Sequence, residues 1–214
     1  MTDPAPRLKP IDLEALRSQG VPAAVLAEAG EPPTWPPLIG RLRADPDRPL
    51  DLMRALAWGM DDPERLWWTC LAGRLEETAS GRQGRSEALV LSERWLREKD
   101  DSVRYQAFER SREESALGPA AMVGLAAFVC GPSLAKPDQP AEPPPPNLPF
   151  ETTLGALVAI AASPFLGPDG FHHIAGIGLD IAAGGDGREA ARNALTAIQA
   201  PHAEAPAPGK QAPT

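Results

Sequence analysis

Apolar residues recur along most of this chain at intervals of three or four, which is the spacing of one face of an α-helix. Between residues 49 and 60, for example, Leu52, Leu56 and Met60 follow one another at steps of four. No segment alternates strictly between apolar and polar residues, as a half-buried strand does, and no Asn-Gly hairpin signal is present. The pattern therefore predicts an all-α protein.

Helix boundaries are marked as well. Asp61 to Glu64 combine an acidic N-cap with a proline and a carboxylate in the first turn, and they predict a helix that continues to about Ala79. The connections between expected helices are short, which favours antiparallel neighbours in an irregular helical bundle or array. The other helices are expected at 11–17, 22–29, 49–60, 86–99, from 102 past 108, and at 120–130, 152–162, 171–183 and 188–199, with residues 31–37 as an extended connector.

A proline-rich segment, residues 131–149, interrupts this helical pattern. Its consecutive prolines Pro143, Pro144, Pro145 and Pro146 lack amide donors and have fixed φ angles, so they must run as extended polyproline II. We expect this polyproline strap to cross the protein's own helices and pack on its tryptophans, because apolar helices flank it on both sides. The alternative is an exposed ligand for an aromatic-lined groove of a partner.

The sequence indicates a single α-helical domain over residues 11–199. Residues 1–10 and 200–214 are rich in proline and small or polar residues, and we expect both ends to be disordered. Five tryptophans and 43% hydrophobic residues in a chain of 214 indicate a packed interior.

Charge and cysteine usage narrow the function. The net charge is −8 and no basic stripe appears, so nucleic-acid binding has no electrostatic support. No apolar run approaches the roughly 18 residues that a membrane span needs, and the first residues lack the features of a secretory signal. Cys70 and Cys130 lie among apolar residues, which is typical of buried thiols in a reducing compartment. We expect a cytoplasmic protein.

Candidate chemistry is sparse. The neighbours His172 and His173 project about 100° apart on a helix, so the pair cannot chelate one ion without distortion. Asp169 precedes His173 by four residues and is placed to orient its ring. One interpretation of this segment is a capped helix start. The alternative is the site of a small enzyme or ligand-binding domain. We find no serine-nucleophile elbow and no phosphate loop, and we expect no cofactor and no metal.

The tryptophans give the strongest physical signal. Trp67 and Trp68 are adjacent on one predicted helix, so one ring can fill the core while the other meets a second helix or the surface. Core packing of both is the favoured interpretation, and an exposed ring would be an anchor for a partner. The candidate partner-binding residues are Trp67, Trp68, Trp95, Pro143, Pro144, Pro145 and Pro146.

Several motifs together resemble an uncharacterised bacterial family of small α-helical proteins. They are ERLWW at 64–68, the tryptophan-bearing segment 87–95, the helix start at 102–108, AAFVCGPSLAKPDQPAEPPPPNLP at 126–149 and GIGLDIAAG at 176–184. The family carries a GGSL turn, a PPPP strap and a closing LGLDIARG-like helix, and the resemblance covers residues 50–187. This chain departs from it at Cys130 and Pro132, and at Ala182-Ala183 in place of Ala-Arg.

No catalytic residues are assigned in this family, so the resemblance implies none. It also implies that the gene of this protein lies among genes for secretion machines. We therefore expect a non-enzymatic cytoplasmic interaction protein that binds protein partners. It would be an adaptor, accessory or chaperone-like subunit of a larger bacterial assembly, for which a secretion system is one candidate. A site near Asp169, His172 and His173 in a small enzyme or ligand-binding domain is the alternative.

Overall fold

The computed structural model describes residues 6–82, 85–114, 116, 118–136 and 139–200. In this part of the chain it holds eleven α-helices, three short 3-10 turns and no strand, so the all-α prediction is confirmed. The helices are α1 (Leu13–Ser18), α2 (Ala23–Leu26), α3 (Trp35–Ala44), α4 (Pro49–Gly59), α5 (Asp62–Ser80), α6 (Glu87–Glu98), α7 (Asp101–Glu113), α8 (Met122–Val129), α9 (Leu148–Ala161), α10 (Gly170–Ala182) and α11 (Arg188–Gln199).

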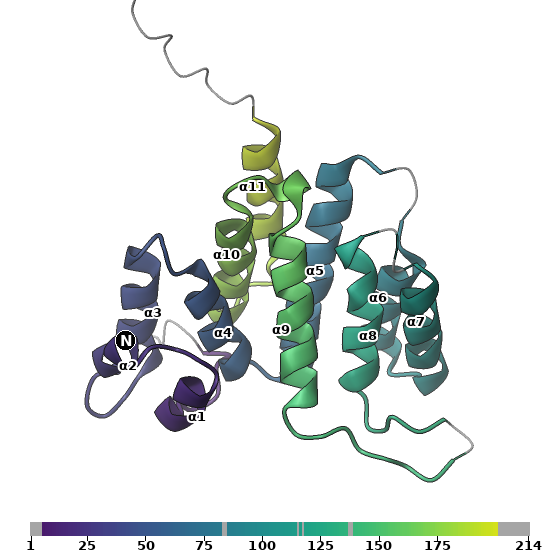
Figure 1. The fold of residues 1–214 in the computed structure, drawn as a ribbon, viewed down its shortest axis with the longest axis horizontal. Coiled ribbons are helices and arrows are strands. Elements are labelled where there is room, and N and C mark those ends of the chain that lie inside the picture. Colours follow the sequence, from purple (N-terminus) through teal and green to yellow (C-terminus); the bar gives the residue numbers. More distant parts are fainter. Residues whose placement is uncertain (1–5, 83–84, 115, 117, 137–138, 201–214) are drawn as a thin grey trace, which may run out of the picture.

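The long helices α5 and α9 pack against each other in the middle of the molecule (Figure 1). On one side of this pair lie α6, α7 and α8, which pack closely on one another. On the other side α10 packs on α4 and α5, and α11 packs on α5 and α10. Helices α1 to α3 lie at the outer edge beside α4.

The start and end of α5 follow its sequence signals closely. Asp61 is the N-cap, Pro63 lies in the first turn with Asp62 and Glu64, and the carboxylates there face the positive end of the helix dipole. The helix ends at Gly81, whose φ of 62° is left-handed and favours glycine. The predicted helix from Asp61 to about Ala79 is thus found at Asp62–Ser80.

Helix α3 was not predicted, α9 begins earlier than the sequence indicated, and both have proline in the first turn. Helix α3 begins at Trp35, inside the segment expected to be an extended connector, and α9 begins at Leu148 rather than near Thr152. Proline is tolerated at these positions because the first amides of a helix have no partner within the helix. Prolines that looked like breakers therefore mark helix starts.

Trp68 belongs to one hydrophobic core whose residues run from Leu16 to Ala194 along the chain. Its ring is fully buried, and its indole Nε1 donates a 2.9 Å hydrogen bond to the carbonyl oxygen of Ile174. Helix α10 passes so close that a Cβ at Gly178 would lie 2.6 Å from the Trp68 ring. Core packing of Trp68 is therefore what joins α5 to α10.

The prediction that the polyproline strap is buried against the helices is wrong. The strap belongs to the long connection between α8 and α9 at one end of the molecule (Figure 1), where Pro143, Pro145 and Pro146 are exposed and Pro144 is half-buried. Because α8 and α9 pack directly on each other, their apolar faces are covered without the strap.

The N-terminal segment lies against the body of the protein. The amide of Arg7 donates to the carbonyl oxygen of Ala182 at 3.4 Å, and that of Lys9 donates to Gly59 at 2.8 Å. Residues 6–10 were expected to be disordered, and the structure instead places them on α10 and α4. Residues 1–5 and the tail from 201 lie outside the described residues. Within the described residues, no helix combines the length and the apolar character that crossing a membrane requires.

Candidate functional site

Each of the three candidate tryptophans is engaged inside the protein. Trp67 is half-buried, donates from Nε1 to the carbonyl oxygen of Asp186 at 2.8 Å, and has the Arg188 guanidinium 5.2 Å from its ring centroid. Trp95 is 6% exposed and has the Lys99 ammonium 4.6 Å from its ring centroid. Trp68 lies in the core, as the favoured interpretation expected, whereas Trp67 is only half-buried and packs against the core.

The residues of the histidine site do not converge on one pocket. His172 is exposed and lines a small pocket of about 140 Å³, whose lining includes neither Asp169 nor His173. His173 is half-buried, and burial lowers its pKa although Asp169 acts in the opposite direction. No group of three metal-ligating side chains occurs among the described residues. The third histidine of the sequence, His202, lies outside the described residues.

The two thiols are shielded. Burial raises the pKa of Cys70 far above its ordinary value, and it raises that of half-buried Cys130 to about 12. Both thiols therefore stay protonated at neutral pH, and the thiolate is the nucleophilic form.

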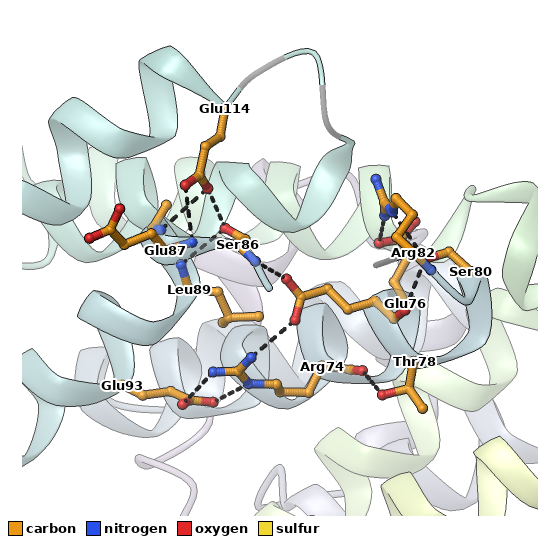
Figure 2. Close-up of polar contacts among 12 residues, drawn as sticks. Arg74, Glu76, Thr78, Ser80, Arg82, Ser86, Glu87, Leu89, Glu93 and Glu114 are labelled. Atoms are coloured by element: carbon orange, nitrogen blue, oxygen red, sulfur yellow. Dashed lines mark hydrogen bonds and ion pairs between the residues drawn. The ribbon is translucent and has the colours of Figure 1, made fainter. Parts of the chain in front are cut away.

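A polar network joins the C-terminal half of α5 to α6 and α7 (Figure 2). Arg74 of α5 donates from Nε and Nη2 to the two carboxylate oxygens of Glu93 in α6, both at 2.8 Å. Glu114 accepts from the Ser86 hydroxyl at 2.7 Å and from the Glu87 amide at 3.0 Å, and so covers the start of α6. Since its carboxylates are held by donors, this network fastens three helices together and leaves none of these groups poised for chemistry.

Another carboxylate of the network, that of Glu76, is fully buried. It pairs with Arg82 and accepts a 3.1 Å hydrogen bond from the hydroxyl of Ser163, which precedes the 3-10 turn Pro164–Leu166. The sequence had singled out neither this glutamate nor its partners, because they are 6 and 87 residues apart along the chain.

The polyproline strap is fixed at both of its ends. At the entrance the amide of Leu134 donates to the carbonyl oxygen of Glu142 at 2.7 Å, and the hydroxyl of Ser133 accepts from the Glu142 amide at 2.9 Å. At the exit the amide of Leu148 donates to the carbonyl oxygen of Pro145 at 3.0 Å, which makes the turn into α9. The prolines between are thus held in place while three of the four remain exposed.

A pocket of about 420 Å³ lies beside the exit of the strap. It is built from the N-terminal segment, the end of α4 and the starts of α5 and α9. Its lining residues are Lys9, Pro10, Asp12, Trp58, Asp62, Arg65, Pro146, Asn147 and Phe150. Two aromatic rings form part of its wall, with Trp58 meeting Phe150 edge-on at a centroid distance of 5.1 Å and an interplanar angle of 82°.

Arg65 is the unusual residue of this pocket, because its side chain is only 4% exposed. Its Nη1 donates to the carbonyl oxygens of Ala57 at 2.7 Å and Met60 at 3.0 Å, and its Nη2 pairs with Asp62. Its Nε, however, is buried and has no acceptor among the described residues. Burial lowers the pKa of Arg65, although the neighbouring carboxylate of Asp62 opposes this. An arginine stays protonated at neutral pH, so Nε remains a donor.

Sequence reasoning missed this pocket because its residues come from four separate stretches of the chain. The available signal was the position of Arg65 on α5, three and four residues before the buried Trp68 and Thr69. Residues at that spacing share one helical face, so this spacing would have placed Arg65 on the face that points to the interior.

Comparison with known proteins gives one family match. Residues 38–182 fit the model of a family described as a family of unknown function (DUF6931). This confirms the resemblance to an uncharacterised family, and the match includes the strap and every pocket residue except those of the N-terminal segment. No curated protein and no solved structure matches the chain.

Proposed function

This chain belongs to the DUF6931 family, and we propose that it is a non-enzymatic interaction protein that presents Pro143–Pro146 to an aromatic-lined groove of a protein partner. The observation that carries the proposal is the exposure of Pro143, Pro145 and Pro146 in a segment that is anchored at both ends.

Such a segment suits recognition by its partner because it is already in the bound conformation. Polyproline II has no internal hydrogen bonds and fixed φ angles, so little chain entropy is lost when a groove closes on it. The hydrogen bonds at Leu134 and Leu148 restrict it further at the two ends. Pro146 begins the turn into α9, so Pro143, Pro144 and Pro145 form the extended part that is offered to aromatic rings.

The negative charge beside the strap indicates which charge the partner's groove should carry. Glu142 directly precedes Pro143 and is exposed, and the chain as a whole carries a net charge of −8. A groove with a cationic residue at the edge that receives Glu142 would complement this charge and speed the encounter.

The role that we propose is that of an adaptor, accessory or chaperone-like subunit in a cytoplasmic bacterial assembly, with a secretion system as the candidate. The anchored strap supports the interaction, and the family resemblance supports the setting. The alternative site near Asp169, His172 and His173 lacks comparable support, because the pocket that His172 lines includes neither of the other two residues.

Affinity capture from the native host tests this function. The full chain and a Pro143→Ala/Pro145→Ala variant are used as baits, and the proteins that each retains are quantified. The control variant is Pro33→Ala/Pro168→Ala, which changes two exposed prolines elsewhere on the molecule. We expect a partner that the full chain and the control retain and that the strap variant loses. Equal retention by all three baits, or turnover of a small molecule by the purified protein, would contradict the proposal.

A further inference from the structure

We propose that the groove between α7 and α8 is the contact surface of a homodimer, in which a second copy of this chain covers the exposed side of α8. The two helices pack side by side (Figure 1), and the groove along their border has a volume of about 510 Å³. Apolar side chains form most of its wall, among them Phe108, Met122 and Leu125.

Helix α8 is apolar all round, yet one side of it faces water. Each of its eight residues has an apolar side chain or is glycine. Met122 and Leu125 lie one turn apart on this helix, and they are 37% and 36% exposed. A helix at a protein surface ordinarily has a polar outer face, and a helix that is apolar all round is ordinarily buried. The exposed side of α8 is therefore suited to be covered by a further layer of protein.

The groove beside this ridge is held in one shape. The ring of Phe108 stacks on that of Phe128 at a centroid distance of 4.3 Å and an interplanar angle of 18°. At Gly124, α8 comes so close to α7 that a Cβ would overlap with the carbonyl oxygen of Ala107. A docking partner thus meets a preformed surface, and little conformational entropy is lost when it binds.

The shape of this surface is self-complementary. The ridge of Met122 and Leu125 and the groove along α7 lie next to each other on the same copy. In a twofold contact both copies use the same patch, so a ridge that enters the groove of the other copy receives that copy's ridge in its own groove. Methionine is flexible and adapts to such a contact.

The charges at the rim are self-complementary as well. Arg112 is the one charged side chain among the described residues that line the groove, and its Nη1 lies 3.6 Å from Oε2 of Glu109, one turn earlier on α7. Both side chains are largely exposed, so this pair contributes little within one copy. Where two α7 helices meet antiparallel, Arg112 of each copy faces Glu109 of the other. Opposite charges then meet twice across the contact.

This charge pattern favours a second copy over a partner of a single charge sign. A partner with only cations would meet a like charge at Arg112, and a partner with only anions would meet one at Glu109. The net charge of −8 on each copy opposes association. Charges more than about 8 Å apart are largely screened at physiological ionic strength, however, and the ridge itself carries no charge.

Light scattering on the full chain, at concentrations from about 5 to about 500 μM, tests the proposal. We expect the average mass to rise from that of one chain towards that of two. Met122→Gln/Leu125→Gln makes the ridge polar and should weaken the association at least about 10-fold. Val90→Gln, which alters another exposed apolar residue on α6, should leave it unchanged. The mass of a single chain at every concentration, or an equal effect of the two variants, would overturn the proposal.

Charge-swapped variants test whether a second copy is the occupant. Arg112→Glu and Glu109→Arg, each taken alone, place like charges opposite each other in the homodimer and should weaken it about 3- to 10-fold. An equimolar mixture of these two variants should restore the association, because each contact between them then joins an acid to a base. Failure of the mixture to associate more tightly than either variant alone would overturn the twofold contact.

The dimer and the strap can be tested separately. The Pro143→Ala/Pro145→Ala variant should dimerise as the unaltered chain does, because neither proline lines the groove. Loss of the strap's partner and loss of the dimer are therefore distinct results. If both proposals hold, one dimer presents two straps, and a partner with two grooves binds it more tightly than it binds a single copy.

Discussion

The amide of Leu134 donates a 2.7 Å hydrogen bond to the carbonyl oxygen of Glu142, across eight residues of chain. This bond closes the neck of the connection between α8 and α9, and the polyproline strap begins at the next residue. The strap therefore leaves the body of the protein from a fixed point and returns to it through the turn at Pro145 and Leu148. This anchoring turns an exposed proline run into a preorganised surface.

The first prediction concerns Ser133, which supports this neck. Its hydroxyl accepts from the amides of Ala135 at 3.1 Å and Glu142 at 2.9 Å. Ser133→Ala should cost about 1 kcal/mol locally, because both amides lose a partner. We expect faster hydrogen exchange at Ala135 and Glu142 with little change in global stability. Ser18→Ala, at the end of α1, is the control, and unchanged exchange at the neck would show that Ser133 does not hold it.

Alanine substitutions at two glycines of α10 test how closely α10 packs on α5. Gly178→Ala places a methyl group 2.6 Å from the buried Trp68 ring, and it should destabilise the fold by about 1–3 kcal/mol in urea denaturation. Gly176→Ala meets no atom within 4 Å and should be neutral or stabilising by up to about 1 kcal/mol, since alanine favours helix. Similar free energies of unfolding for the two variants would contradict the described packing.

The carboxylate of Glu114 should contribute more to the stability of the folded protein than that of its neighbour Glu113. Glu114→Gln removes the charge that accepts from the Ser86 hydroxyl and the Glu87 amide at the start of α6, and should cost about 1 kcal/mol. Glu113→Gln alters an exposed carboxylate that pairs with Arg110, and should cost less than about 0.5 kcal/mol. Chemical denaturation of both variants measures the difference. An equal loss for the two would mean that the cap does not contribute.

The pH dependence of stability should carry a contribution from His173. Burial lowers its pKa in the folded protein below the ordinary 6.5, so the unfolded chain takes up this proton first as the pH falls. This contribution to the free energy of unfolding is fully present above pH 6.5. It declines as the pH falls from 6.5 through the lower pKa that His173 has in the folded protein. His173→Gln should reduce the loss of stability in that window. His172→Gln, at the exposed neighbour, is the control, and an identical pH profile for His173→Gln and the unaltered protein would refute the assignment.

The helical framework could be predicted where local signals agree with the final packing. The acids and proline at Asp61–Glu64 defined the start of α5, and α11 was found at its predicted residues. Trp35 and Leu148 were missed as helix starts because proline in a first turn cannot be told from proline in a connector without its surroundings.

The exposure of the strap and the existence of the pocket depend on contacts between distant segments. Pro143–Pro146 must be extended whatever surrounds them, but their burial is decided by whether α8 and α9 pack on each other directly. The pocket needs Lys9, Trp58, Arg65 and Phe150 to meet, and nothing in the local sequence of any one of them indicates the other three.

The most direct measurement of the central claim is competition by a peptide of residues 139–149 for the partner that the full chain retains. The account predicts that this peptide displaces the partner, and that the same peptide with alanine at 143 and 145 is at least about 10-fold less effective, since two proline contacts of roughly 1 kcal/mol each are lost. Failure of the natural peptide to displace the partner at any concentration, or equal displacement by both peptides, would contradict it.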